Sequence, residues 1–385
     1  MAGALDGLVV VDLTSHLSGP YAAMMLADHG ADVLKIERPD GGDDARRMPP
    51  FIEGESAPFM VWNRNKRSVA LDLKSAEGKA RLLELVDGAD ILIENMRPGV
   101  MDKLGLGYAT LSQRNPRLIY AAISGFGQTG PYASRGGFDL IAQGMSGLIS
   151  TNGPVEGPPY RLPIAISDVA AGMFLAFGIL AAVESRHKSG RGQMVETSLL
   201  EAAISFGVYE AAHYSTHRTR PDRIGQMHRG SAPYQCLAAA DGYMVVGAAQ
   251  QAFWADFVGI IGRPELKDDP RFQTNASRVK NNAALIAIIE TELVKKPKAY
   301  WLAELEKAKI PCGPMLNYDE VFTDPHVLAR QMYVATEHVK AGRFDTIGVP
   351  VKMSDTPGSV RRAAPALGQH TAEVLATPPK PRGKS

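Results

Sequence analysis

A single aspartate stands where a polar turn gives way to a long apolar segment. Asp168 follows Ile164-Ala-Ile-Ser167 and precedes residues of helical composition that reach Ser185. A carboxylate at such a junction is commonly a helix N-cap, because it accepts hydrogen bonds from the first free backbone N–H groups. Aspartate is also a nucleophile that can divide one difficult transfer into two steps through a covalent intermediate. The two roles are compatible, since the positive end of the helix dipole would favour the charge that develops during attack on a carbonyl.

The neighbours of Asp168 predict a site that is partly shielded from water. Val169, Met173, Phe174 and Phe177 are apolar, and Gly172 permits the close approach of a ligand or of another backbone. A carboxylate that has lost part of its hydration is a stronger nucleophile. These residues raise the weight of the catalytic interpretation over the capping one.

Several motifs, found in one order along the chain, carry a resemblance to a known family. They are PIAISDVAAG (163–172), SGRGQMVETSLLEA (189–202), NRNKRSVALDLK (63–74), ENMRPG (94–99), LGLGY (104–108), SGFGQTGPY (124–132), IP (310–311) and DPH (324–326). Together they closely resemble the family III CoA-transferases, also called the CaiB/BaiF family. The resemblance extends over most of residues 5–375.

The resemblance implies a mechanism and an architecture. An aspartate at the position of Asp168 attacks an acyl-CoA thioester to form an acyl-aspartyl anhydride. The CoA thiolate then returns to give an aspartyl-CoA thioester, and an incoming acid completes the exchange. CoA thioesters are substrates, and no permanently bound cofactor or metal is needed. The implied fold is α/β, with a large Rossmann-like domain containing a parallel sheet, a smaller α+β domain, and two identical subunits interlocked in a homodimer.

The resemblance also implies which residues bind CoA. Arg38, Lys74 and Lys103 match phosphate and nucleotide contacts, and Arg97 is a further candidate cation. The alternative for each basic residue is an ordinary solvated surface charge. The positions expected to line the same groove are His16, Leu71, Asn95 and Met96.

Two departures from the pattern and one similarity bear on the substrate. Leu17 stands where many formyl-CoA-type members have glutamine, and a glycine-rich loop over the active site corresponds here to GAAQQ (247–251). Formyl-CoA and oxalate are therefore disfavoured. The C-terminal half is most similar to members that exchange CoA among small dicarboxylates. Arg161 could pair with a distal carboxylate, although a loop arginine is more often solvated.

Two other functions remain open from the sequence. Racemases of the same family pair a histidine with the aspartate, because moving a proton between two faces of a carbon requires two acid–base groups. That histidine precedes an aspartate matching Asp139, and here the place holds Phe138, although His16 could substitute for it. A non-catalytic acyl-CoA-binding protein is the third possibility, but it would not need Asp168.

The predicted elements that position these residues alternate between strands and helices. Strand-like runs cover residues 8–13, 31–36, 90–93 and 118–123, and a helix is expected over 21–29 after a break at Ser18-Gly-Pro20. Such alternation predicts parallel strands with right-handed crossovers. The loop after the first strand lacks G-x-G-x-x-G spacing, so a dinucleotide site is poorly supported.

A domain boundary is expected where the composition changes. Residues 1–214 are assigned to the large domain, the polar stretch 215–230 to a linker, 231–320 to the small domain, 321–377 to a return into the large domain, and 378–385 to a disordered tail. The small domain should open with a hairpin, 234–238 and 243–248, followed by helices over 252–261, 281–295 and 299–308. The return into the large domain should contain a helix over 322–331 and a strand over 346–351.

Composition excludes several other classes of protein. Lys and Arg total 42 against 41 Asp and Glu, so no overall charge favours nucleic acid or an anionic membrane. The two cysteines, Cys236 and Cys312, have no disulfide or zinc spacing, which favours a reducing, cytoplasmic location. The N-terminus lacks a basic segment of the secretory type, and the apolar run 169–183 is shorter than a membrane span requires.

Overall fold

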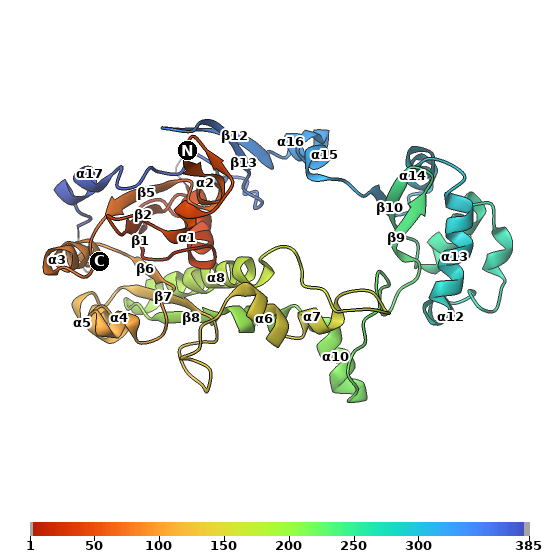
Figure 1. Cartoon of the computed structure of the whole chain (residues 1–385), viewed down its shortest axis with the longest axis horizontal. Coiled ribbons are helices and arrows are strands. Elements are labelled where there is room, and N and C mark those ends of the chain that lie inside the picture. Colours follow the sequence, from red (N-terminus) through yellow and green to blue (C-terminus); the bar gives the residue numbers. More distant parts are fainter. Residues whose placement is uncertain (1–2, 381–385) are drawn as a thin grey trace. The chain divides into compact units, whose positions relative to one another are not determined.

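The computed structural model describes residues 3–380 (Figure 1). These residues divide into two compact units. The large unit contains residues 3–148, 161–216 and 324–380, and the small unit contains residues 149–160 and 217–323. Residues from both ends of the described chain therefore belong to the large unit.

A six-stranded sheet forms the centre of the large unit, with every neighbouring pair of strands parallel. The order is β5-β2-β1-β6-β7-β8, which is the Rossmann order 3-2-1-4-5-6 when only these strands are numbered. The α/β class with a parallel sheet is thereby confirmed. The strands are β1 (Val9–Asp12), β2 (Asp32–Glu37), β5 (Lys66–Ala70), β6 (Ile91–Glu94), β7 (Ile119–Ser124) and β8 (Met194–Ser198).

The four strands nearest the centre correspond to the four predicted runs, whereas the two edge strands were not predicted as strands. β5 contains Lys66 and Arg67, and β8 contains Glu196, so neither has the apolar pattern of a buried strand. Lys66 is nevertheless fully buried, because its ammonium bonds to Asp12 of β1 at 2.9 Å. A contact between distant segments therefore makes this charged strand compatible with the core.

Helices cover both faces of the sheet (Figure 1). On one face, Val10 of β1 packs with α1 (Ser18–Asp28), α8 (Ile166–Ser189) and α9 (Leu199–Ser205). On the other face, Val11 packs with residues of α3, α4, α5 and α17. Successive residues of a strand point to opposite faces, so β1 contributes to both cores. The helices of the second face are α3 (Ala76–Asp87), α4 (Val100–Lys103), α5 (Tyr108–Arg114) and α17 (Thr371–Ala376).

Two of the helices that carry the site begin earlier than predicted. α8 begins at Ile166, two residues before Asp168. α1 begins at Ser18 rather than at Tyr21, since proline is tolerated in a first helical turn and Pro20 lies there. α8 has 24 residues, and its length and composition would allow it to cross a membrane, but half of its most apolar stretch is buried. Because it packs against α1 and the sheet, we interpret α8 as a core helix.

The small unit has its own sheet and its own core. The predicted hairpin is present as β9 (Tyr234–Ala239) and β10 (Gly242–Gly247), and β11 (Cys312–Pro314) adds to β10 in antiparallel fashion. Trp254 and Phe257 are fully buried beneath this sheet. The helices of the unit are α11 (Gln251–Ile260), the 3-10 helix Pro264–Lys267, α12 (Asn275–Lys280), α13 (Asn282–Leu293), α14 (Lys298–Lys307) and α15 (Tyr318–Thr323). α10 (Val208–His217) belongs to the large unit except for its last residue.

Several boundaries differ from the sequence-based assignment. The segment 149–160, expected in the large domain, groups with the small unit, where Arg223 donates to the carbonyls of Pro154 at 3.1 Å and Gly157 at 2.7 Å. The stretch 217–230, expected as a linker, also belongs to that unit. In the predicted tail, Pro379 lies against Gly88, and residues 381–385 fall outside the described part of the chain.

The strand expected over 346–351 is present only at residues 346 and 347, which end β13 (Gly342–Ile347). β13 pairs with β12 (Tyr333–His338) in an antiparallel hairpin of the large unit. The helix expected over 322–331 is interrupted at Asp324, which caps a new helix through bonds from His326 and Val327. The remaining elements are the 3-10 helix Asp44–Arg47, β3 (Phe51–Ile52), β4 (Glu55–Ser56), α2 (Ala57–Trp62), α6 (Asp139–Met145), α7 (Leu148–Thr151), α16 (Pro325–Ala329), β12 (Tyr333–His338) and β13 (Gly342–Ile347).

Candidate active site

Asp168 is the third residue of α8 and lies in its first turn. The predicted N-cap role is wrong, because the helix begins at Ile166 and Ala165 occupies the cap position without a side-chain bond. Asp139, at the start of α6, supplies the missing acceptor: its Oδ1 receives the Ser167 N–H at 2.9 Å. The Asp168 carboxylate is therefore not committed to capping and stays at the positive end of the helix.

The close approach of α8 to α1 places Asp168 beside Ser18. A Cβ atom at Gly172, one turn after Asp168, would lie 2.7 Å from the Ser18 carbonyl oxygen and 3.2 Å from the Tyr21 ring. Only glycine permits this approach, as the sequence indicated. Ser18, the first residue of α1, hydrogen-bonds to the Asp168 carboxylate through its side chain.

The surroundings of Asp168 favour its protonated form. Burial and the nearby negative charge of Asp139 together raise the pKa of Asp168 to about 7, against the opposing hydrogen bond from Ser18. Burial acts because a carboxylate loses hydration in a site of low polarity. Near neutral pH a substantial share of Asp168 is therefore ionised and poorly hydrated, which suits a nucleophile.

The second carboxylate, Asp139, is held in place by a buried amide. Gln143, one turn further along α6, donates to Asp139 Oδ2 at 2.7 Å and accepts the Leu162 N–H at 2.9 Å. Its side chain is fully buried. Asp139 is thus fixed by both Gln143 and Ser167, so its charge has a constant position relative to Asp168.

A cavity of about 400 Å³ opens onto Asp168. We call it the Asp168 cavity. It is formed within the large unit by the loop after β1, the turn after β6, the loop after β7 and the first turn of α8. Residues of contrasting chemistry line it, among them His16, Trp62, Asn95, Arg97, Arg135 and Phe138. The cavity therefore combines the Asp168 carboxylate with cations and apolar walls.

A larger cavity of about 750 Å³, the nucleotide groove, lies at the carboxyl ends of four neighbouring strands. The loops after β1, β2, β5 and β6 form it, at the edge where ligands bind in open α/β sheets. His16, Asn95 and Met96 line both cavities, so the groove and the Asp168 cavity adjoin. The groove residues that the sequence singled out are His16, Arg38, Leu71, Lys74, Asn95 and Met96.

The other two predicted CoA contacts lie elsewhere. Arg97 lines the Asp168 cavity, and Lys103, at the end of α4, lines neither of the two cavities. Within the groove, Arg38 donates to Asp44 at 2.8 Å and to the Gly42 carbonyl at 3.0 Å. An anionic ligand at Arg38 would therefore have to compete with Asp44. The Arg38–Asp44 ion pair is exposed, and exposed ion pairs are weak in water.

Buried charges position the loop that both cavities share. The Lys35 ammonium contacts Asp43 at 2.8 Å and donates to the Thr14 carbonyl at 2.9 Å. Asp43 in turn accepts the His16 N–H at 3.0 Å and the Ser15 hydroxyl at 2.8 Å. His16 has a φ of 67°, a left-handed conformation that these bonds hold in place.

Replacing Lys35 with methionine should destabilise the fold, because it leaves the buried Asp43 carboxylate without its cation. We expect the free energy of unfolding to fall by about 3–5 kcal/mol, measured by urea denaturation followed by circular dichroism. Lys188→Met is the matched control, since Lys188 is exposed at the end of α8 and should change stability by less than about 0.5 kcal/mol. Equal midpoints for the two variants would contradict this account of the network.

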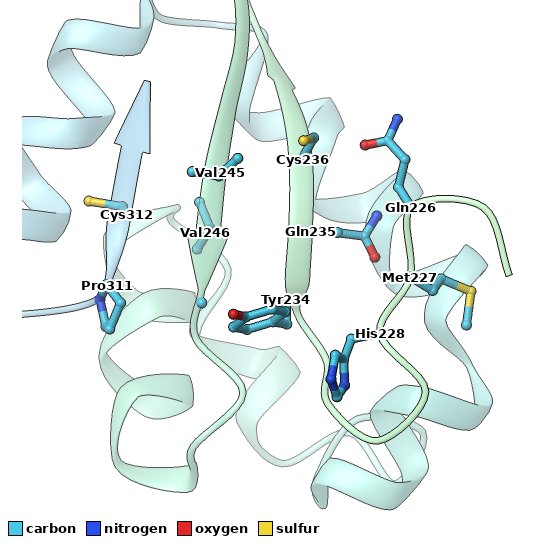
Figure 2. A pocket seen from close by; sticks show the side chains of 11 residues that line it. Gln226, Met227, His228, Tyr234, Gln235, Cys236, Val245, Val246, Pro311 and Cys312 are labelled. Atoms are coloured by element: carbon cyan, nitrogen blue, oxygen red, sulfur yellow. The ribbon is translucent and has the colours of Figure 1, made fainter. Parts of the chain in front are cut away.

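The small unit contains a separate cavity of about 610 Å³ beside its hairpin (Figure 2). The Tyr234 and His228 rings lie near each other there, with centroids 5.2 Å apart. Cys236 and Cys312, both free thiols, also line it. Within residues 3–380, no acidic residue, lysine or arginine lines this cavity, and we place no step of catalysis there.

Sequence reasoning missed three features of the site. Asp139 drew attention only through its neighbour Phe138, Arg135 was not considered, and Gln143 has no local signal of its role. Conversely, Arg161, proposed as a partner for a distal carboxylate, does not line the Asp168 cavity and donates to the Leu162 carbonyl. The number of residues between Asp139 and Asp168 does not indicate that the first turn of α6 lies against the first turn of α8.

Comparison with known proteins gives a consistent result. The family model of CoA-transferase family III matches residues 5–371. The chain is 37% identical to succinyl-CoA:glutarate CoA-transferase of Mus musculus, over 96% of this chain and 85% of the relative. It is 40% identical to acetyl-CoA:oxalate CoA-transferase of Acetobacter aceti, over 97% of this chain and 95% of the relative.

A solved structure shows the same fold. A CAIB/BAIF family protein from Brucella suis superposes with a TM-score of 0.88 at 36% identity, covering 98% of this chain and 99% of that protein. The resemblance inferred from the motifs is thereby confirmed over nearly the whole chain.

Proposed function

The chain belongs to CoA-transferase family III and is a CoA-transferase, and we propose that Asp168 is the nucleophile of a two-stage exchange. An Asp168 oxygen attacks the thioester carbonyl and expels the CoA thiolate, which leaves an acyl-aspartyl anhydride. The thiolate attacks the aspartyl carbonyl, which releases the first acid and leaves an aspartyl-CoA thioester. The second acid repeats the sequence in reverse and leaves as its CoA thioester.

One observation supports this proposal above the others: a poorly hydrated carboxylate, with its pKa raised to about 7, opens into a cavity that adjoins a groove large enough for a nucleotide. Attack requires an ionised carboxylate, and partial dehydration makes that carboxylate more reactive. The helix dipole and the Ser18 side chain partly offset the cost of holding the charge there.

We also propose that the acids exchanged are small dicarboxylates. The mouse relative is named for succinyl-CoA and glutarate, whereas the Acetobacter relative is named for acetyl-CoA and oxalate. Identity alone does not separate these substrates. The cations in the Asp168 cavity support a second negative charge on the acid.

Hydroxylamine provides a direct test of the intermediate. It attacks activated acyl groups, so the enzyme incubated with succinyl-CoA and hydroxylamine should acquire a hydroxamate at Asp168, detectable by mass spectrometry of the peptide that contains it. A racemase or a binding protein would leave Asp168 unmodified. The parallel measurement is chromatography of CoA esters after mixing succinyl-CoA with glutarate, for which glutaryl-CoA is the expected product.

Lys74 provides a test of the nucleotide groove. Lys74 is exposed, lines the groove and forms no ion pair with another described residue, so its ammonium is free to meet a phosphate. Lys74→Ala should raise the KM for acyl-CoA about tenfold and change kcat by less than about twofold. Lys79→Ala on α3, outside the groove, is the control. An unchanged KM would show that Lys74 does not contact the CoA phosphates. The other proposed cation contacts are Arg38, Arg97 and Lys103.

We further propose that the active enzyme is a homodimer. α8 leaves Met173, Phe174, Phe177 and Leu180 at least 42% exposed in the single chain. Apolar patches of this kind usually mark an interface between proteins. Light scattering coupled to size-exclusion chromatography should give twice the chain mass of 41.4 kDa, and a monomeric mass would oppose the proposal.

A further inference from the structure

Two cations line the Asp168 cavity without a carboxylate partner. Among residues 3–380, neither the Arg97 nor the Arg135 guanidinium forms an ion pair or a side-chain hydrogen bond. By contrast, the cavity's histidine, His16, lies 3.8 Å from Asp44. Cations that face a cavity and remain unpaired are available to an anionic ligand.

Arg135 is held by aromatic rings rather than by acceptors. Its guanidinium carbon lies 4.6 Å from the centre of the Tyr132 ring and 5.7 Å from that of Phe126. Contact with a ring face stabilises the cation and leaves the N–H groups at its edge free. Arg135 is therefore positioned without the loss of its donors.

Close contact between glycines fixes the Arg135 loop against the end of β7. A Cβ atom at Gly125 would lie 2.6 Å from the Gly137 Cα. Two residues beyond Gly137 the chain reaches Asp139, which caps the helix that carries Asp168. The same short segment thus connects Arg135 to the reacting carboxylate.

The two arginines lie on different loops of the cavity. Arg97 follows Asn95 and Met96, which also line the nucleotide groove, so it lies on the CoA side. Arg135 lies on the loop that leads to Phe138 and Asp139, and neither it nor Phe138 lines the groove. This separation favours Arg97 for CoA and Arg135 for the acid.

We propose that Arg135 binds the distal carboxylate of a dicarboxylic acid while the proximal carboxylate reacts at Asp168. This inference rests on the proposed function and assigns the residue that recognises the second charge. A diacid must approach a site that already contains the Asp139 and Asp168 carboxylates, so it requires a compensating cation. The planar guanidinium can bind a carboxylate through two parallel hydrogen bonds, whereas a monoacid of equal length gains nothing from it.

A comparison of glutarate with valerate isolates this contact, because the two acids have the same number of carbons and differ in the distal carboxylate. In a ping-pong reaction the kcat/KM for the acceptor reports only the step from enzyme-bound CoA thioester, so the donor does not affect the ratio. The assay uses succinyl-CoA as donor and chromatography of the product esters. Wild-type enzyme should prefer glutarate.

Arg135→Gln should lower kcat/KM for glutarate by roughly 10- to 100-fold and that for valerate by less than about twofold. Arg135→Lys should recover part of the loss, because it restores the charge without the bidentate geometry. Arg81→Gln, on the surface of α3 and outside both cavities, is the control and should match wild type.

The outcomes separate the two proposals. Absence of transfer from succinyl-CoA to any acid by the wild-type enzyme would reject the proposed function itself. Transfer with an unchanged glutarate-to-valerate ratio in Arg135→Gln, or a wild-type enzyme that does not discriminate, would overturn the assignment of Arg135 alone. The valerate rate also serves as an internal check that the variant is folded and active.

Discussion

Replacing Asp168 with asparagine is expected to reduce CoA transfer by at least about four orders of magnitude in kcat. Asparagine has nearly the same shape and can keep a hydrogen bond to Ser18, but its amide cannot form the anhydride or the aspartyl-CoA thioester. Because Asp168 does not line the nucleotide groove, CoA itself should bind with an affinity within about threefold of wild type. Exchange of labelled CoA into succinyl-CoA measures the first quantity, and calorimetry measures the second.

A matched variant is needed because any change to a first helical turn can perturb the fold. Asp256→Asn makes the same chemical change at an exposed position of α11 in the small unit. It should exchange CoA at the wild-type rate and give no change in the hydroxylamine product. Asp168→Asn that continues to exchange CoA at a similar rate would eliminate the covalent mechanism.

The rate of the reaction should fall steeply below neutral pH. Burial and Asp139 raise the pKa of Asp168 to about 7, and only the ionised form can attack. Hence kcat/KM for acyl-CoA should decrease about tenfold for each pH unit below that value and level off above it. The midpoint should follow Asp139, because its negative charge is one cause of the raised pKa.

Asp139→Asn tests that dependence. The variant loses the charge but retains an Oδ1 acceptor for Ser167, so the acid limb of the profile should shift toward lower pH. In the variant, the new amide nitrogen at position 139 would face the Gln143 Nε2 donor, so that hydrogen bond is lost. We expect this loss to lower the rate at all pH values. The position of the midpoint, rather than the maximum rate, is therefore the informative quantity. A midpoint that stays at the wild-type pH would show that burial alone sets the pKa.

The same ionisation should be visible in stability. The folded chain holds the Asp168 proton up to a pH of about 7, whereas the unfolded chain releases it near the ordinary value of 3.8. Below a pH of 3.8, Asp168 does not affect the free energy of unfolding. Between 3.8 and about 7 its contribution makes the folded chain progressively less stable as the pH rises, and above about 7 the full loss of stability is present. Asp168→Asn should gain roughly 2–4 kcal/mol over wild type between pH 4 and pH 8, measured by urea denaturation.

Local patterns were sufficient for the central part of the large unit. β1, β2, β6 and β7 are buried on both faces and are mainly apolar, although β2 also contains the buried Lys35. The edge strand β5 escaped detection because the buried Lys66 depends on Asn63 and on two distant residues, Asp12 and Pro20, for its hydrogen-bond acceptors. The loop residues of the groove were found because they belong to motifs, and four parallel strands bring those motifs to one edge.

By itself, the sequence determined the class of the fold and the family, and it singled out the carboxylate that we propose as the nucleophile, since these depend on apolar runs and on motifs that are contiguous in the chain. The tertiary structure alone decided the electrostatics of the site. Asp139 caps the helix of Asp168 and raises its pKa, Gln143 fixes Asp139, and Arg135 lines the same cavity without an ion-pair partner among residues 3–380. The physical reason is that a pKa, a cap and an unpaired charge depend on distances between segments, and no spacing along the chain specifies those distances.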